Sequence, residues 1–162
     1  MNIMSLIMSS EGIMDDRNAY RPKAFICYRG ISSNSNAGLE IAETVYDYLQ
    51  DHKEFAPVFF AQKNNFTYNF INDAESIVKG VSKFIIILSK NFFSGFYTVK
   101  DGKTIINQQS STCLELYYAI KYNVTIYPIF SSEFHWDDVS EETTKHLCEI
   151  FGEENFNNLT RV

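Results

Sequence analysis

The sequence predicts an α/β protein whose open, flavodoxin-like parallel sheet carries helices on both faces. Two observations lead to this prediction. Short apolar runs alternate with segments whose apolar residues recur at helical spacing, in the order β-α-β-α-β-α-β-α. Such alternation is typical of a parallel sheet with right-handed crossovers. One run, KFIIILS at residues 83–89, holds consecutive aromatic and β-branched residues without alternation, which indicates a strand buried on both faces.

Length and composition are those of one globular domain. The chain has 162 residues, of which 45% are hydrophobic and 21% are charged. A domain of this size buries about 70% of the surface that its unfolded chain exposes. Weak periodicity at residues 1–20 predicts a weakly ordered N-terminal extension, which leaves residues 21–162 for the domain.

Charge and apolar runs argue against several classes of partner. A net charge of −6, without a cluster of Lys and Arg, argues against a nucleic-acid partner. The start of the chain lacks the basic and continuous apolar parts of a signal peptide, and no run has membrane-spanning length. Three cysteines without CxxC spacing favour a reducing compartment. We therefore expect a cytoplasmic protein without a membrane partner.

A first strand and a first helix are predicted near the start of the domain. AFICY at residues 24–28 is an apolar run that ends at Arg29 and Gly30. The polar loop that follows ends in Ser35 and Asn36, either of which can cap the next helix. The apolar residues that recur at helical spacing in this helix are Leu39, Ala42, Tyr46 and Leu49.

The middle of the chain contains a second strand, a second helix and an unusually long connection. PVFF at residues 57–60 is the second strand, and a loop without Gly or Pro follows it. The second helix runs through FINDAESIVKG at residues 70–80, with Gly80 as its stop signal. The connection at residues 90–110 separates the third strand from the next helical pattern. Connections of this length are usually functional or mobile.

The last third of the chain reads as helix, strand and helix. SSTCLELYYAIKYN is the third predicted helix, and its apolar stripe is Cys113, Leu116, Tyr117 and Ile120. VTIYPIF at residues 124–130 is the fourth strand, and Pro128 predicts pairing at an edge or an end of the sheet. Asp138 and Glu141 have capping-box spacing and are expected to open a helix that ends near Gly152. The terminal NLTRV could begin a fifth strand.

Functional residues are expected at the carboxyl edge of the sheet, where open parallel sheets bind their ligands. The segments at this edge are residues 28–30, 60–66 and 89–93 and the loop after Phe130. Glu115, placed by the pattern in the first turn of its helix, is expected to point away from the apolar stripe and toward this edge. The alternative is structural, because an acidic residue in the first turn stabilises any helix by about 0.3–1 kcal/mol.

Other chemistries have little support in the sequence. His52, His135 and His146 lack zinc-ligand spacing and are expected at the surface or at helix caps, so no metal site is predicted. Cys27 and Cys113 are expected to be buried thiols. The sequence contains no GxGxxG motif, no Walker loop and no Ser-His-Asp order.

Four segments in this order resemble the sequence boxes of bacterial TIR (Toll/interleukin-1 receptor) domains. KAFICYRG resembles the opening box, and VFFAQKNNF stands where the family has its second strand and BB loop. VSKFIIILSKNFFSG is similar to the third box, and STCLELYYAIKYNVTIYPIF to the helix with Cys and Glu and the strand after it. The resemblance spans about residues 23–136. The chain differs from the family at Cys27, where Ser is commoner, and at Thr112, where Trp is frequent.

The resemblance implies an NAD⁺ nucleosidase. Many TIR domains cleave the bond between nicotinamide and ribose with a Glu at the start of this helix, here Glu115. The product would be ADP-ribose or a cyclic ADP-ribose isomer, and NAD⁺ would be a substrate, with no further cofactor. The resemblance also implies TIR–TIR self-association, a sensor domain or a downstream effector as partner, and a role in anti-phage defence.

Contacts to NAD⁺ are expected from the residues at the carboxyl edge. These candidates are Tyr28, Arg29, Gly30, Phe60, Lys63, Asn64, Phe66 and Ser89. Arg29 could contact the pyrophosphate or pair with a surface carboxylate. The aromatic members could stack on a base or belong to the core, and Lys63 and Asn64 are candidate loop contacts.

Two other functions fit the same pattern. A TIR adaptor that only binds other TIR domains would leave Glu115 as a helix-terminal charge. A different flavodoxin-like module, such as a relative of the nucleoside deoxyribosyltransferases, would share the sheet and also use a Glu. Release of nicotinamide from NAD⁺ distinguishes an NAD⁺ nucleosidase from both of these alternatives.

Overall fold

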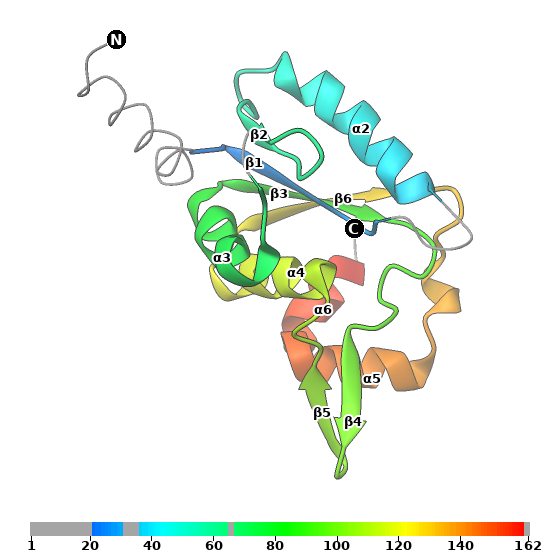
Figure 1. Cartoon of the computed structure of the whole chain (residues 1–162). Coiled ribbons are helices and arrows are strands. Elements are labelled where there is room, and N and C mark those ends of the chain that lie inside the picture. The colour runs from blue at the N-terminus through cyan, green and yellow to red at the C-terminus, as the bar shows by residue number, and fades with distance from the viewer. Residues whose placement is uncertain (1–20, 31–35, 65–66, 161–162) are drawn as a thin grey trace, which may run out of the picture.

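The computed structural model describes residues 21–30, 36–64 and 67–160. Four parallel strands form an open sheet in the order β2-β1-β3-β6 (Figure 1). They are β1 (Ala24–Tyr28), β2 (Val58–Phe59), β3 (Lys83–Leu88) and β6 (Thr125–Phe130). Strand order reverses between β1 and β3, as it does in flavodoxin-like sheets. The predicted fold class is confirmed, whereas the predicted extension at residues 1–20 lies outside the described residues.

β3 is buried on both faces, as its uninterrupted apolar run predicts. The strand pairs with β1 on one side and with β6 on the other. Its side chains alternate between two cores: Phe84, Ile86 and Leu88 enter one, and Ile85 and Ile87 enter the other. Each fully buried side chain of this size stabilises the fold by about 1.5–3 kcal/mol relative to an exposed one.

Helices cover both faces of the sheet (Figure 1). α2 (Ala37–Gln50) packs on one face and contributes Ala42 and Leu49 to the core there. The core on the other face receives side chains from α3 (Phe70–Gly80), α4 (Ser111–Lys121), α5 (Glu141–Phe151) and α6 (Glu153–Thr160). A short 3₁₀ turn, Trp136–Asp138, precedes α5.

Polar caps set where the helices begin. Asn69 accepts from the N–H of Ile71 at the start of α3, and Ser110 accepts from the N–H of Cys113 at the start of α4. Asn36 occupies the cap position of α2, but its side chain makes no cap hydrogen bond, and Ser35 lies outside the described residues.

The prediction that Asp138 opens α5 is wrong by two residues. Ser140 is the cap, because its Oγ accepts from the N–H of Thr143 at 3.1 Å, and Asp138 belongs to the preceding 3₁₀ turn. The predicted end near Gly152 is confirmed, and Gly152 has φ +87°.

The long connection after β3 contains a hairpin that the sequence interpretation missed. β4 (Tyr97–Lys100) and β5 (Lys103–Ile106) pair as antiparallel strands, and Figure 1 shows the hairpin projecting from the body of the molecule. Asp101 and Gly102 join the strands with φ +52° and +73°. Two positive φ values are typical of a type I′ turn, for which Asp-Gly is a preferred sequence.

The two ends of the predicted sheet have different outcomes. Pro128 lies in β6, which pairs only with β3 within the four-stranded sheet, so the edge position is confirmed. A fifth strand at the C-terminus is contradicted up to Thr160, because residues 153–160 form α6. Phe156 and Leu159 are three positions apart and both buried, and this helical spacing outweighs the strand-like composition of NLTRV.

Candidate active site

The start of α4 is tied to the carboxyl end of β1. Thr112 Oγ1 donates to the carbonyl of Tyr28 at 3.4 Å, and Cys27 Sγ lies 3.8 Å from the carbonyl of Thr112. Ser110 caps the helix immediately before these contacts. The second turn of α4, which carries Glu115, is therefore held at a defined position below the edge of the sheet.

Glu115 is buried rather than facing the open edge. Its side chain is only 6% exposed, and the whole run from Thr112 to Leu116 is buried. The predicted orientation away from the core is therefore wrong, because neighbouring segments cover this part of α4 on several sides. Glu115 also lies in the second turn, since the helix begins at Ser111 and its first turn contains no acidic residue. The favourable interaction of an acidic side chain with the helix dipole is confined to the first turn. The alternative that Glu115 serves only to stabilise its helix is therefore weakened.

Tyr68 is the direct partner of the buried carboxylate, and the sequence interpretation did not select it. Its hydroxyl donates to Glu115 Oε1 at 2.8 Å. Its ring packs edge-on against Phe59, with the centroids 5.0 Å apart. Tyr68 directly precedes the cap of α3 and lies just beyond the loop 60–66 that was expected at the carboxyl edge. The position of this tyrosine, between a loop at the carboxyl edge and a helix cap, was the sequence feature that could have identified it as a site residue.

Burial and hydrogen bonds act in opposite directions on Glu115. Burial raises the pKa of Glu115 to about 7, and hydrogen bonds from Tyr68 and Cys27 lower it. Within residues 21–30, 36–64 and 67–160, no lysine, arginine or histidine contributes to this pKa. Among these residues the carboxylate is supported by neutral donors, and a cation placed beside it would favour its ionised form.

Cys27 and Cys113 are buried thiols, as predicted. Both are fully buried. Burial, followed by the charge of Glu115, raises the pKa of Cys27, and burial raises the pKa of Cys113 to about 12. Nucleophilic thiols have a lowered pKa, so neither residue is suited to that role.

Two of the predicted contact residues, Arg29 and Ser89, make contacts within the protein at this edge. Arg29 Nη1 donates to the carbonyls of Phe92 at 3.2 Å and Ser94 at 2.7 Å, and these bonds tie the end of β1 to the segment after β3. The acceptors are backbone carbonyls rather than the surface carboxylate considered for Arg29, and its contact to the pyrophosphate stays a prediction. Ser89 is buried beneath the first turn of α2, where a Cβ on Gly38 would approach Ser89 Oγ to 3.1 Å.

The aromatic candidates Tyr28 and Phe60 lie on the α2 side of the sheet. Phe60 is 1% exposed and belongs to the core there, so it packs rather than facing a ligand. Tyr28 is partly buried, contacts Phe60 edge-on at 5.3 Å and accepts a hydrogen bond from Gln62 at 3.2 Å. Burial raises the pKa of Tyr28, and the negative charge of Glu115 raises it further. The two side chains therefore interact across the end of β1.

The remaining candidates are in or beside exposed loops. Gly30 and Lys63 are exposed. Among the described residues Asn64 Nδ2 is buried and has no hydrogen-bond partner, so it is a donor that water or a ligand can satisfy. Phe66 lies outside the described residues.

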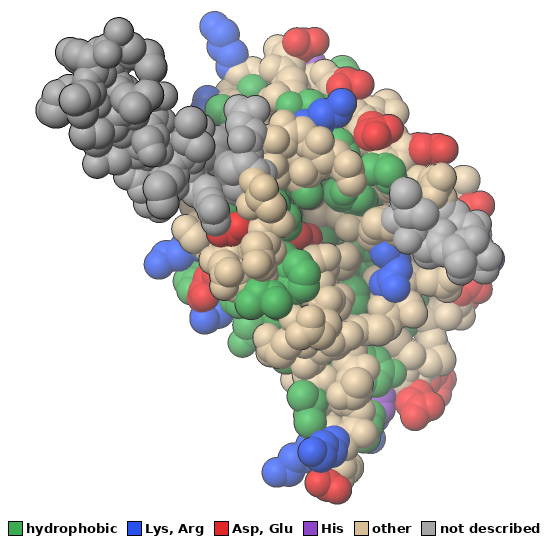
Figure 2. Space-filling model, in the orientation of Figure 1, with side chains coloured by type: hydrophobic (Ala, Val, Ile, Leu, Met, Phe, Trp, Pro, Cys, Tyr) green, Lys and Arg blue, Asp and Glu red, His purple; other side chains and the backbone are tan. Residues whose placement is uncertain are grey.

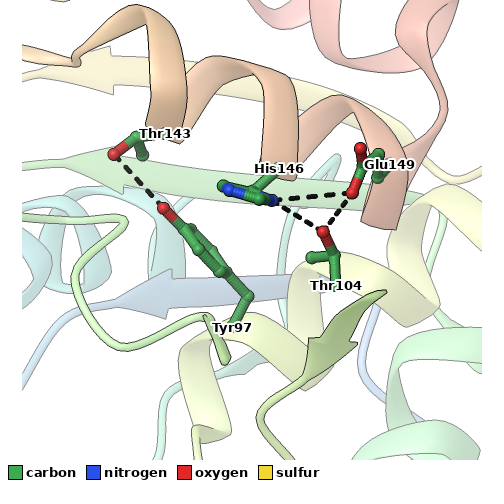
Figure 3. A network of polar contacts seen from close by, with 5 residues as sticks. All are labelled: Tyr97, Thr104, Thr143, His146 and Glu149. Carbon is green, nitrogen blue, oxygen red and sulfur yellow. Dashed lines mark hydrogen bonds and ion pairs between the residues drawn. The ribbon is translucent and has the colours of Figure 1, made fainter. Parts of the chain in front are cut away.

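His146 belongs to a polar cluster that joins the hairpin to α5 (Figure 3). Its Nδ1 lies 2.6 Å from Thr104 Oγ1 and 3.5 Å from Glu149 Oε2, and Thr104 also donates to Glu149. Tyr97 donates to Thr143 at 3.4 Å beside this group. The surface position expected for His146 is wrong, because its side chain is 14% exposed. In a catalytic triad the acid and the hydroxyl contact different ring nitrogens of the histidine. Here Glu149 and Thr104 both contact Nδ1 of His146, so the cluster does not have that arrangement.

A cavity of about 650 Å³ lies elsewhere, between the segments that follow β3 and β6. Glu115 does not line it. Its ionisable lining residues are Lys90, Tyr97, Glu133, His135 and Asp138. In the described parts of the chain the buried polar residues are Asp73, Ser89, Thr112, Glu115 and Ser131, and none of them borders this cavity. The cavity and the buried carboxylate are therefore separate features, and a buried carboxyl with a raised pKa is a candidate functional group.

Charged groups elsewhere are dispersed. On the face drawn in Figure 2, Lys and Arg side chains are scattered among Asp and Glu and do not form a basic patch. Among the described residues, no group of three or more His, Cys, Asp or Glu is placed to hold a metal ion. None of the helices in the described ranges is long and apolar enough to cross a membrane.

Neither a model of a known protein family nor a curated protein sequence matches this chain. The TIR resemblance therefore stays a prediction from the sequence.

Proposed function

We propose that this chain is an NAD⁺ nucleosidase in which Glu115 is the catalytic carboxylate. One observation carries the proposal: Glu115 is buried, and its supporting groups, Tyr68 and Cys27, are neutral donors. A buried carboxylate without a cationic partner is costly to ionise. A ligand that brings or develops positive charge removes that cost, and NAD⁺ does both.

The reaction fits a single carboxylate. The bond between the ribose C1′ and the nicotinamide nitrogen breaks, and its electron pair leaves with the neutral nicotinamide. Positive charge then builds on C1′ and the ring oxygen of the ribose. A carboxylate beside the sugar stabilises this oxocarbenium-like charge, which is electrostatic stabilisation aimed at the transition state. The arrangement resembles glycoside hydrolysis with one of the usual two carboxylates.

The acceptor decides the product. Attack of a water oxygen on C1′, with loss of one proton, gives ADP-ribose. Attack by a hydroxyl of the same molecule gives a cyclic isomer and likewise releases one proton. Glu115, with a pKa raised to about 7, is suited to accept that proton near neutral pH.

Other features of the proposal follow from the sequence and the site. Asn64, with its orphaned buried Nδ2, is a candidate donor to the substrate. The TIR resemblance supports self-association as a requirement for activity, a partner that senses a signal or reads the product, and a role in bacterial anti-phage defence. The alternative is a TIR–TIR adaptor without catalysis.

The test is release of free nicotinamide from NAD⁺ at high protein concentration, where assembly is favoured. Glu115→Gln should lower the release at least about 100-fold, since single groups that stabilise transition-state charge contribute 10²–10³-fold. Glu75→Gln, which alters an exposed carboxylate on α3, is the matched control and should retain activity. Mass spectrometry identifies the product. Equal inactivity of the wild type and Glu115→Gln under assembling conditions would overturn the proposal and favour the adaptor.

A further inference from the structure

We propose that Tyr68 is a positioning residue for Glu115, because its hydroxyl holds the carboxylate oxygen Oε1 and so fixes the direction of the carboxylate. The inference rests on the proposed function for its catalytic consequence. It extends that function to a residue that lies 47 positions earlier in the chain and outside the segments that resemble a known family box.

Tyr68 is itself held firmly. Asn69, the next residue, accepts from the N–H of Ile71 at 3.1 Å, and its own N–H donates to Asp73 Oδ2 at 2.8 Å. The Tyr68 ring packs edge-on against the buried Phe59. A hydroxyl fixed at the start of a capped helix can impose a direction on the carboxylate that it contacts, whereas one on a free loop could not.

The chemistry of the contact suits a carboxylate that must receive a cation. A neutral O–H donor stabilises the ionised form without supplying positive charge, so the carboxylate stays available for charge compensation by the ligand. Burial, followed by the charge of Glu115, raises the pKa of Tyr68, so the phenol remains a donor throughout the working range. The titratable groups that interact with Glu115 from the elements around it are Cys27 and Tyr28 on β1 and Tyr68 before α3.

The first arm of the test does not depend on activity. The free energy of unfolding of the wild type, relative to Glu115→Gln, should fall as pH rises and level off once Glu115 is ionised in the folded state. The difference in the free energy of unfolding between Tyr68→Phe and Tyr68→Phe/Glu115→Gln should level off about one pH unit higher. The reason is that loss of a hydrogen bond to the ionised carboxylate raises the pKa of Glu115. Replacement of Tyr68 by 3,5-difluorotyrosine, a stronger donor, should move the plateau to lower pH.

The second arm is the pH profile of nicotinamide release. Its acidic limb should move upward by about the same one pH unit in Tyr68→Phe, so that activity lost at pH 6.5 is largely regained at pH 8.5. Tyr122→Phe is the matched control, because Tyr122 also donates to a carboxylate, that of Glu75, but on the exposed surface of α3 and α4. That variant should leave both arms unchanged.

The outcomes separate the two claims. Plateaus at the same pH with and without the Tyr68 hydroxyl would overturn the inference, whatever the activity. A wild type that releases no nicotinamide would overturn the proposed function, while the unfolding arm would still decide whether Tyr68 controls the carboxylate. An active wild type with an unmoved acidic limb in Tyr68→Phe would overturn the catalytic consequence of the inference.

Discussion

The hydroxyl of Tyr68 donates a 2.8 Å hydrogen bond to Oε1 of Glu115 and so joins the start of α3 to the second turn of α4. The bond lies at the carboxyl end of β1, where Cys27 approaches the same carboxylate. Because both donors are neutral, Glu115 retains the cost of a buried negative charge. The following predictions test this arrangement and the fold that holds it.

Glu115→Gln should stabilise the protein at alkaline pH. Burial raises the pKa of Glu115 to about 7, above the unfolded value of about 4.3. A raised pKa means that the wild type is most favoured below the unfolded value and loses stability as pH rises through about 7. At pH 8 the amide should gain up to about 3 kcal/mol over the wild type. Urea unfolding at pH 5 and pH 8 measures the difference, which should shrink at the lower pH.

Glu75→Gln supplies the contrast for this measurement. Hydrogen bonds from Tyr122 and Lys121 lower the pKa of Glu75, so the sign is reversed and the amide should not gain stability at pH 8. A stability gain at pH 8 that is equal in both variants would contradict the account of Glu115.

Gly38→Ala should destabilise the fold by about 1–3 kcal/mol, as overpacking commonly does. Its Cβ would lie 2.9 Å from the Arg29 carbonyl and 3.1 Å from Ser89 Oγ. Gly80→Ala is the matched control, because no atom lies within 4 Å of the added Cβ. Thermal unfolding of both variants checks the close approach of α2 to the ends of β1 and β3, and equal melting temperatures would contradict it.

The Thr104 hydroxyl should hold the hairpin to α5. Thr104→Val preserves shape but removes the contacts to His146 and Glu149 (Figure 3). We expect a local loss of about 0.5–1.5 kcal/mol, visible as faster hydrogen exchange in β4 and β5 while the core strands keep their protection. Uniformly faster exchange through β1 and β3 would mean that the hairpin is part of the central cooperative unit.

The three thiols should differ in reactivity. Cys27 and Cys113 are buried, and Cys148 is partly exposed. In the native protein a maleimide should modify Cys148 first, and after denaturation it should modify all three. Mass spectrometry after brief labelling measures this order. Early modification of Cys27 would contradict the closed packing beside Glu115.

The parts of the fold that depend on strong local patterns were predictable. The uninterrupted apolar run of β3, the helical pattern of residues 70–80 and Pro128 in β6 are each signals carried by neighbouring residues. The hairpin was missed although Asp101-Gly102 is a turn signal, because each strand is only four residues long and β5, Lys-Thr-Ile-Ile, does not alternate apolar and polar residues. The possible fifth strand at NLTRV is not formed up to Thr160, because Phe156 and Leu159 have helical spacing and are both buried.

The candidate site was predictable only in part. Glu115 could be selected from its helix and from the carboxyl-edge rule, but its burial could not be read from the pattern of α4 alone. A helical wheel describes one helix, whereas the cover over Glu115 comes from β1 and from Tyr68. Arg29 and Phe60 lie at the edge as predicted, but the sequence did not reveal that Arg29 binds backbone carbonyls after β3 or that Phe60 packs in the core.

The most direct test of the central claim is nicotinamide release from NAD⁺ at pH 8 by the wild type, Glu115→Asp and Glu115→Gln, with each protein shown to be folded and assembled. A carboxylate that stabilises positive charge on the ribose predicts measurable release by the wild type, a reduced rate for the shorter acid and a loss of at least about 100-fold for the amide. Release by Glu115→Gln at the wild-type rate, or none by the folded and assembled wild type, would contradict the account.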